Sequence, residues 1–212
     1  LTSANANPGT TIVFQIPVTG AVTDTVSGAF VIQPATTLPV IAANGTSIDG
    51  ATQTSFLGSN PNTTGGPPIV ISGALLGANA DLLAVSAQDC IIQNLSLSGR
   101  SAGTVRGIHL TGTANNNTVS NCVIGLSAAG TLTFSGYPTP AQAGPTAIGV
   151  LIESTAGTAN NRIGDPAGTP AFPGNVIAGN TQHGIQITAS SFNRIRGNTI
   201  GTNAANTAGL GN

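Results

Sequence analysis

The stretch that decides the fold is Gly184–Thr202, GIQITASSFNRIRGNTIGT. It contains three short segments in which apolar and polar residues alternate, and these segments begin at Gly184, Asn193 and Asn198. Alternation with a period of two is typical of a β-strand that buries one face. The stretch therefore predicts three short strands joined by very short turns.

The same order of segments recurs three times upstream. The unit reads G-[IVL]-x-[ILV], a spacer, N-x-[IV] and then N-x-I-G, and its copies are Gly107–Gly125, Gly149–Gly179 and, more loosely, Leu82–Ser98. A unit of this size cannot bury its own apolar face, whereas a stack of such units buries a continuous core. The repeat therefore predicts an all-β solenoid, a single-stranded parallel β-helix with three short strands in each coil.

The alternation also predicts which side chains face the core. The inward set is Ile108, Leu110, Val119, Ile124, Val150, Ile152, Ile163, Ile177, Ile185, Ile187, Ile195 and Ile200. Runs of Ile and Val suit such a core, because β-branched side chains pack well on a pleated surface.

Asparagine recurs at the corner before the second strand of the unit and again before the third. The first group is Asn117, Asn161 and Asn193, with Cys90 at the equivalent position; the second is Asn175 and Asn198, with Leu95 and Cys122. Stacked asparagines can form amide ladders from coil to coil. The alternative is that asparagine serves only as a good turn residue.

Several segments resemble right-handed parallel β-helix proteins of the pectin-lyase-like type, and more narrowly the bacterial secreted and cell-surface proteins with N-x-I-x-G-N…G-I-x-I repeats. The segments are Asn175–Asn180, Gly197–Thr202, Ala4–Gly9 with Thr11–Phe14, and Leu38–Val40 with Ser47–Gly50. The resemblance covers essentially the whole chain. It implies a right-handed helix of about five coils and an extracellular or cell-surface location. It is specific for the fold and weak for function, because one fold hosts many functions.

We expect one domain over residues 1–212, which divides into three parts. Residues 1–81 would hold an N-terminal cap strand and an irregular first coil, residues 82–202 the regular coils, and residues 203–212 a tail leading toward a further coil or a neighbouring subunit. The cap strand is expected at Thr10–Ile16, and Gly50–Pro68 is expected to be a loop. The first coil is expected to use Phe30–Gln33, Pro39–Ala42, Thr46–Asp49 and Ile69–Ile71.

Charged residues make up 5% of the chain and the net charge is -1, against a usual charged fraction of about 25%. A nearly neutral surface argues against nucleic acid as a partner, because binding to phosphates requires a basic patch. No apolar run reaches the roughly 18 residues of a membrane span. We expect an exterior rich in hydroxyl and amide groups.

The acidic residues do not suggest a catalytic pair. Glycoside hydrolysis needs two carboxylates within roughly 5–10 Å, and no two of Asp81, Asp89, Glu153 and Asp165 are expected at one register in adjacent coils. His109 is expected to point outward from a strand and His183 to lie in a turn, with no third ligand near them. The sequence therefore predicts no catalytic residue, no metal site and no cofactor, although an enzyme is not excluded.

Three arginines form a candidate contact surface. Arg162 and Arg194 share one outward register and Arg196 lies two residues further on. They could bind an anionic glycan or a carboxylate of a neighbouring subunit; alternatively, they form a solvated face whose aliphatic stems cover apolar surface. For Cys90 and Cys122, which point inward at different corners, the alternatives are a disulfide and two small buried residues that replace asparagine.

The function we expect is that of a non-enzymatic, extracellular structural or adhesive solenoid whose partner is a second copy of itself. Open strand edges are templates for another β-layer, and head-to-tail contacts that do not close form filaments. The ends expected to meet are Thr11, Ile12, Val13 and Phe14 on one side and Ile185, Ile187, Ile195 and Ile200 on the other.

The alternative is a carbohydrate-binding or polysaccharide-degrading domain, a lyase or hydrolase, with a groove walled by Leu126–Ala147. An ice-binding face would need outward rows of threonine, which Ile91, Thr118, Arg162 and Arg194 do not supply.

Overall fold

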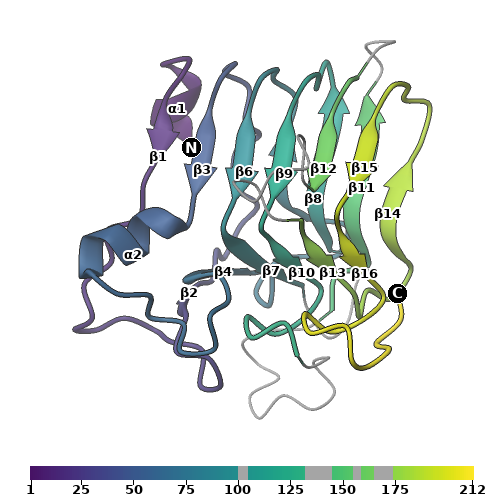
Figure 1. Ribbon diagram of the computed structural model, residues 1–212. Coiled ribbons are helices and arrows are strands. Elements are labelled where there is room, and N and C mark those ends of the chain that lie inside the picture. The colour runs from purple at the N-terminus through teal and green to yellow at the C-terminus, as the bar shows by residue number, and fades with distance from the viewer. Residues whose placement is uncertain (100–104, 132–144, 155–158, 165–173) are drawn as a thin grey trace.

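The computed structural model describes residues 1–99, 105–131, 145–154, 159–164 and 174–212. Within these ranges the chain is mostly β, with parallel sheets of six, six and four strands and two short helices (Figure 1). Strands that follow one another in the sequence belong to different sheets, and each strand pairs with a strand of the neighbouring repeat. This is the architecture of a parallel β-solenoid.

The three sheets, named A, B and C here, run along the stack. Sheet A contains, in order, β1 (Thr11–Ile12), β3 (Ser47–Asp49), β6 (Ile91–Gln93), β9 (Thr118–Ser120), β12 (Arg162–Gly164) and β15 (Arg194–Arg196). Sheet B contains β2 (Phe30–Ile32), β4 (Ile69–Ser72), β7 (Leu95–Ser98), β10 (Val123–Ile124), β13 (Val176–Ile177) and β16 (Thr199–Ile200). Sheet C contains β5 (Asp81–Val85), β8 (Arg106–Gly112), β11 (Ile148–Ser154) and β14 (His183–Ile187).

The register stacks the apolar side chains into rows. In sheet C, Ile108 pairs with Leu83 on one side and with Val150 on the other, and Val150 pairs with Ile185. The expected inward residues of β8 to β13 are at most 1% exposed, and they form one continuous core: Ile108, Leu110, Val119, Ile124, Val150, Ile152, Ile163 and Ile177. The rows end at β14, β15 and β16, where Ile187, Ile195 and Ile200 are exposed by 43%, 43% and 46%.

The corners after β6, β9 and β15 are short because one residue turns the chain in the left-handed conformation. Asn94, Asn121 and Gly197 have φ of 59°, 50° and 68°, and Gly164, which ends β12, has φ of 103°. Asparagine tolerates this region better than other non-glycine residues. At Gly164 a Cβ atom would lie 2.0 Å from the backbone oxygen of Arg196, so this corner requires glycine.

The N-terminal part differs from the expectation in two ways. The strand predicted at Thr10–Ile16 is only the two residues of β1. The backbone after β1 bonds to side chains and not to a neighbouring strand. Phe14 N donates to Thr52 Oγ1, and Ile16 exchanges two hydrogen bonds with Gln53. Both partners lie on α2 (Ala51–Leu57), inside the segment predicted to be a loop. Asp49 Oδ1 accepts from Ala51 N at 2.9 Å at the start of this helix, and Gly58 ends it with φ of 78°. The other helix is α1 (Thr2–Asn5).

The strands before β5 also group differently from the prediction. Phe30–Gln33 and Ile69–Ile71 were expected in the same coil, but β2 and β4 pair with each other and therefore occupy successive levels of sheet B. Pro39–Ala42 forms no strand; its contribution is a single parallel bridge from Ile41 to Val85.

Residues 203–212 fold back on the preceding strands. Leu210 N and Gly211 N both donate to Gly201 O, and Asn212 reaches Ile177 O and Asn180 with its side chain. No helix among the described residues has the length and apolar character to span a membrane.

Candidate functional site

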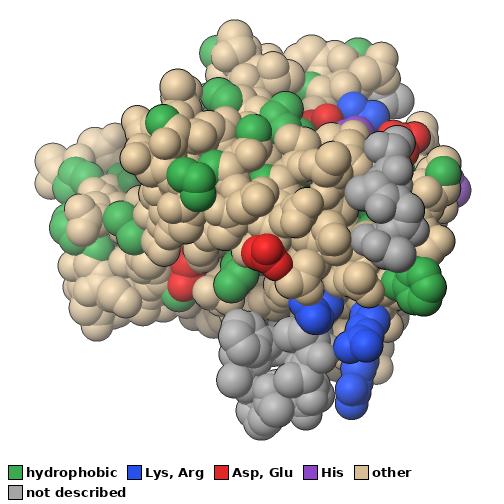
Figure 2. Space-filling model, turned by 90° about the horizontal axis from the view of Figure 1, so that it is seen from above, with side chains coloured by type: hydrophobic (Ala, Val, Ile, Leu, Met, Phe, Trp, Pro, Cys, Tyr) green, Lys and Arg blue, Asp and Glu red, His purple; other side chains and the backbone are tan. Residues whose placement is uncertain are grey.

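A cluster of charged side chains lies on the outward face of sheet C. Asp81 begins β5 and pairs in register with Arg106, which begins β8. His109 lies between the inward residues Ile108 and Leu110, so it projects to the opposite face. Glu153 comes from β11. Figure 2 shows red, blue and purple side chains gathered at one place on the surface.

The four side chains form a chain of alternating contacts. Arg106 Nε donates to Asp81 Oδ1, and Arg106 Nη2 donates to Asn79 O at 3.2 Å. Asp81 Oδ2 lies 3.0 Å from His109 Nδ1. On the other side of the ring, His109 Nε2 lies 3.4 Å from Glu153 Oε2 without forming a hydrogen bond. His109 is 8% exposed, whereas the Glu153 side chain is 48% exposed.

The environment of Asp81 keeps its carboxylate charged. Burial alone would raise the pKa of Asp81, but the hydrogen bonds and electrostatic attraction of His109 and Arg106 outweigh burial and lower this pKa. At neutral pH Asp81 is therefore ionised, and its carboxylate accepts hydrogen bonds but donates none.

Asp81 and Glu153 do not share a register in adjacent coils, yet they meet at one histidine. Asp81 and Glu153 both contact His109, so His109 is not an isolated surface histidine. The aligned repeats place no two of these acids at one register in adjacent coils. Here the two acids lie on β5 and β11, and the strand between them supplies the histidine. The alignment of Leu83 with Ile108 already indicates part of this cluster, because it places Asp81 beside Arg106.

The corner asparagines lie in two stacked rows inside the solenoid. Asn117 Nδ2 donates to Asn161 Oδ1 at 3.0 Å, and Asn161 Nδ2 donates to Asn193 Oδ1 at 3.2 Å. In the second row, Asn175 Nδ2 donates to Asn198 Oδ1 at 3.0 Å. Each of these Oδ1 atoms also accepts the backbone N–H of the asparagine before it.

The two cysteines stand at the early end of these rows as free, buried thiols. A disulfide between them is therefore ruled out, and the alternative of two small buried residues holds. Their backbone N–H groups donate to Asn117 Oδ1 and Asn175 Oδ1. Burial raises the pKa of the Cys122 thiol to about 12 and also raises the pKa of Cys90. Such thiols are poor nucleophiles.

The three arginines line the outer surface of sheet A at its last two strands. Arg162 pairs with Arg194, and Gly164 pairs with Arg196. Arg162 Nη1 donates to Asn116 Oδ1 at 2.6 Å, while Arg194 and Arg196 are exposed. The ion pairs among the described residues involve Arg106 and His109, so these three arginines have no acidic partner there.

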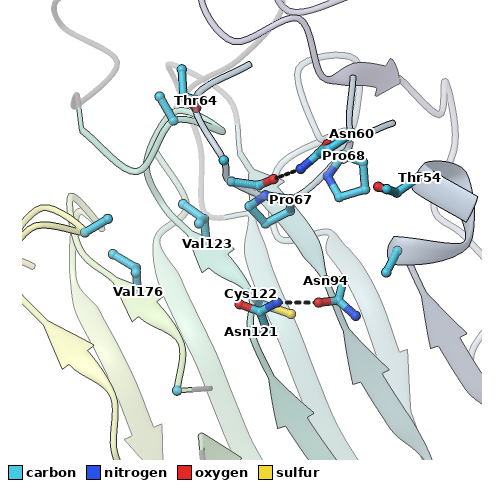
Figure 3. A pocket seen from close by; sticks show the side chains of 16 residues that line it. Thr54, Asn60, Thr64, Pro67, Pro68, Asn94, Asn121, Cys122, Val123 and Val176 are labelled. Carbon is cyan, nitrogen blue, oxygen red and sulfur yellow. Dashed lines mark hydrogen bonds between the residues drawn. The ribbon is translucent and has the colours of Figure 1, made fainter. Parts of the chain in front are cut away.

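A groove of about 300 Å³ lies beside sheet B, between α2, residues 60–68 and the corners before β7 and β10 (Figure 3). Thr54, Asn60 and Thr64 line one side, and Asn94 and Asn121 line the other. Asn121 donates to Asn94, which in turn donates to Asp49 Oδ1. The described lining holds no charged and no aromatic side chain. Arg194 is not among its lining residues. Of the predicted wall Leu126–Ala147, Ala129 lines the groove, and residues 132–144 lie outside the described part of the chain.

The two ends of the stack are apolar. At the β1 end an apolar hollow of about 100 Å³ is lined by Leu1, Ile12, Phe14, Ile32, Leu38, Ile48, Ile71 and Leu83. Of the residues expected to meet at this end, Ile12 and Phe14 line the hollow, Thr11 is exposed and Val13 is 52% exposed. At the other end Ile187 of β14, Ile195 of β15 and Ile200 of β16 are exposed by 43–46%.

No family model, curated protein or solved structure matches this chain.

Proposed function

We propose that this protein is a non-enzymatic structural module, a right-handed β-helix of about five coils that acts outside the cell or at its surface and associates end to end with copies of itself. The observation that carries the proposal is the pair of open apolar ends. At the late end β14, β15 and β16 are edge strands, and at the early end β1 is the edge strand of sheet A, whereas β2 is bridged by Thr23 and β5 by Ile41. Unpaired edges readily accept a further β-layer.

The exposed isoleucines at the late end occupy core positions. Ile195, Ile200 and Ile187 continue the rows of Ile163, Ile177 and Ile152, which are at most 1% exposed. They are exposed by 43–46% because β14, β15 and β16 are the last strands of their sheets, not because these positions face outward.

The early end offers partly exposed matching positions in sheets A and B. Ile12 stands in the sheet A row that leads to Ile195, and Ile32 stands in the sheet B row that leads to Ile200. In sheet C the row that leads to Ile187 starts at Ile41, which bridges Val85 and is already buried. A second copy that placed β1 beside β15 would continue these rows. Uncharged Thr11 would then lie beside Arg194.

The expected strength of this contact is moderate. Full burial of an isoleucine contributes about 1.5–3 kcal/mol, so three half-exposed isoleucines contribute about 2–4 kcal/mol. Loss of translational and rotational freedom costs roughly 4–15 kcal/mol. The edge hydrogen bonds and the other apolar contacts must supply the remainder. We therefore expect assembly to depend on protein concentration.

The test is sedimentation velocity and negative-stain electron microscopy over a concentration series. We expect rods that lengthen with concentration for the unmodified chain and single short particles for Ile195→Lys. Val18→Lys is the matched control, because Val18 is 68% exposed and lies outside the edge strands. A monomer at every concentration, or equal assembly by Ile195→Lys, would refute the proposal.

A second candidate is carbohydrate binding at the groove beside sheet B, supported by the amide and hydroxyl side chains that stand among its apolar lining residues. Such a lining suits the hydroxyl groups of a neutral sugar. Saturable binding to a neutral polysaccharide by a chain that stays monomeric would favour this function over end-to-end assembly.

A further inference from the structure

The two ring nitrogens of His109 have different environments. Nδ1 lies 3.0 Å from Asp81 Oδ2. Nε2 is buried and has no hydrogen-bond partner among the described residues, although the residue as a whole is 8% exposed. A buried polar atom without a partner is costly, because it has lost its bonds to water.

The contact with Asp81 determines which nitrogen carries the proton. An ionised carboxylate only accepts hydrogen bonds, so Nδ1 must be the donor. In the neutral ring, Nε2 then carries a lone pair. This lone pair faces Glu153 Oε2, a second acceptor, at 3.4 Å. Two acceptors at this separation are brought together by a proton, a water molecule or a metal cation between them.

The separation suits a metal ion better than a direct bond. A hydrogen bond between an imidazolium and a carboxylate is usually about 2.7–2.9 Å long with its N–H aimed at the oxygen, and no such bond is formed here. Two ligands about 2.1 Å from a tetrahedral ion, by contrast, are about 3.4 Å apart. Because Glu153 is half-exposed, water can reach the other coordination positions.

We propose that His109 Nε2 and Glu153 bind a divalent transition-metal ion of the zinc type on the outward face of sheet C. Asp81 acts as a positioning residue that orients the ring, and Arg106 holds Asp81 in place. Imidazole with carboxylate is a donor set for zinc, copper or nickel, whereas calcium and magnesium prefer oxygen ligands. A carboxylate behind a metal-binding histidine is a recurrent second layer of such sites.

The site would have two protein ligands, with water completing the coordination. In the part of the chain that the structure describes, no three His, Cys, Asp or Glu side chains converge on one ion. We therefore expect weaker binding than at four-ligand structural sites. The ion would join β8 to β11, and by mass action it would stabilise the folded chain. This inference is independent of end-to-end assembly.

The experiment is a calorimetric titration of the folded chain with Zn²⁺, combined with NMR of the imidazole nitrogens. The chain has two histidines, so the spectrum is simple to assign. We expect one Zn²⁺ per chain and a shift of the His109 Nε2 resonance larger than that of Nδ1. Glu153→Gln should weaken binding about 10-fold or more, in the range known for disturbed metal sites.

His183→Gln is the matched control, because His183 is an exposed histidine on β14 of the same sheet. This variant should bind Zn²⁺ as the unmodified chain does. Glu153→Gln is preferred to a change at His109 because the half-exposed Glu153 can be replaced without disturbing the core. Absence of saturable binding, an unshifted Nε2 resonance, or binding lost in His183→Gln but kept in Glu153→Gln would overturn the proposal.

Discussion

Asn161→Ala tests whether the buried amide rows stabilise the solenoid. The Asn161 side chain is fully buried and makes four hydrogen bonds: Oδ1 accepts from Asn117 N and Asn117 Nδ2, and Nδ2 donates to Ala114 O and Asn193 Oδ1. The change removes this partner from four groups, of which Asn193 Oδ1 is partly buried. At about 1 kcal/mol for each hydrogen bond, we expect unfolding to become easier by about 4 kcal/mol.

The assay is urea denaturation followed by circular dichroism. Asn160→Gly is the matched control: Asn160 is exposed and has φ of 42°, a conformation that glycine adopts without strain, so its effect should stay within about 1 kcal/mol. If Asn161→Ala cost no more than the control, asparagine would act at this corner only as a turn residue. The reasoning about the amide rows would then be wrong.

Two further predictions concern the thiols and the corners. The pKa of Cys122 is about 12 in the folded chain against an ordinary value of 9.0, so the unfolded chain loses the Cys122 proton at a lower pH than the folded chain. The contribution of this thiol to the free energy of unfolding should therefore be fully present below pH 9 and fall above it by up to about 1.4 kcal/mol per pH unit. Denaturation measured as a function of pH should show a shallower fall for Cys122→Ala. An equal fall in both proteins would contradict the raised pKa. At the corner after β12, Gly164→Ala should cost about 3 kcal/mol in chemical denaturation, because its Cβ would meet Arg196 O at 2.0 Å. Gly209→Ala, which meets nothing within 4 Å, should be neutral; equal effects of the two changes would count against this argument.

The sequence was sufficient for the parallel sheets because the solenoid is built from local rules. Alternation fixes which face of each strand is buried, and the repeated corners fix how far one strand is displaced from the next. The residues aligned from the repeats at Leu83, Ile108, Val150 and Ile185 pair in this order across sheet C.

The first 81 residues were harder to predict because tertiary contacts decide their structure. The sequence of helix α2 has no apolar stripe that would predict a helix. Its Gln53 is fully buried and forms hydrogen bonds with the backbone of Ile16. The same bonds divert the chain after β1 from the sheet. Neither effect can be derived from local propensity.

The charged cluster was missed for a geometric reason. Pattern alignment compares residues at one register, whereas Asp81, His109 and Glu153 are displaced along their strands and meet diagonally. Their contacts depend on side-chain length and orientation across β5, β8 and β11, which alternation does not encode. The alignment could have identified the pair Asp81 and Arg106, but not the position of Glu153.

The amide rows also give the molecule a direction. Every side-chain bond within them runs the same way, with Nδ2 of the earlier asparagine donating to Oδ1 of the later one. The amide dipoles therefore align along the stacking axis and reinforce one another. A layer added after Asn193 and Asn198 is best matched by an acceptor, whereas at the opposite end of the rows Asn117 Oδ1 and Asn175 Oδ1 already accept from Cys90 N and Cys122 N. Two copies that met by identical ends would set like dipole ends against each other, so an assembly of this chain is expected to be polar, with all its members pointing the same way.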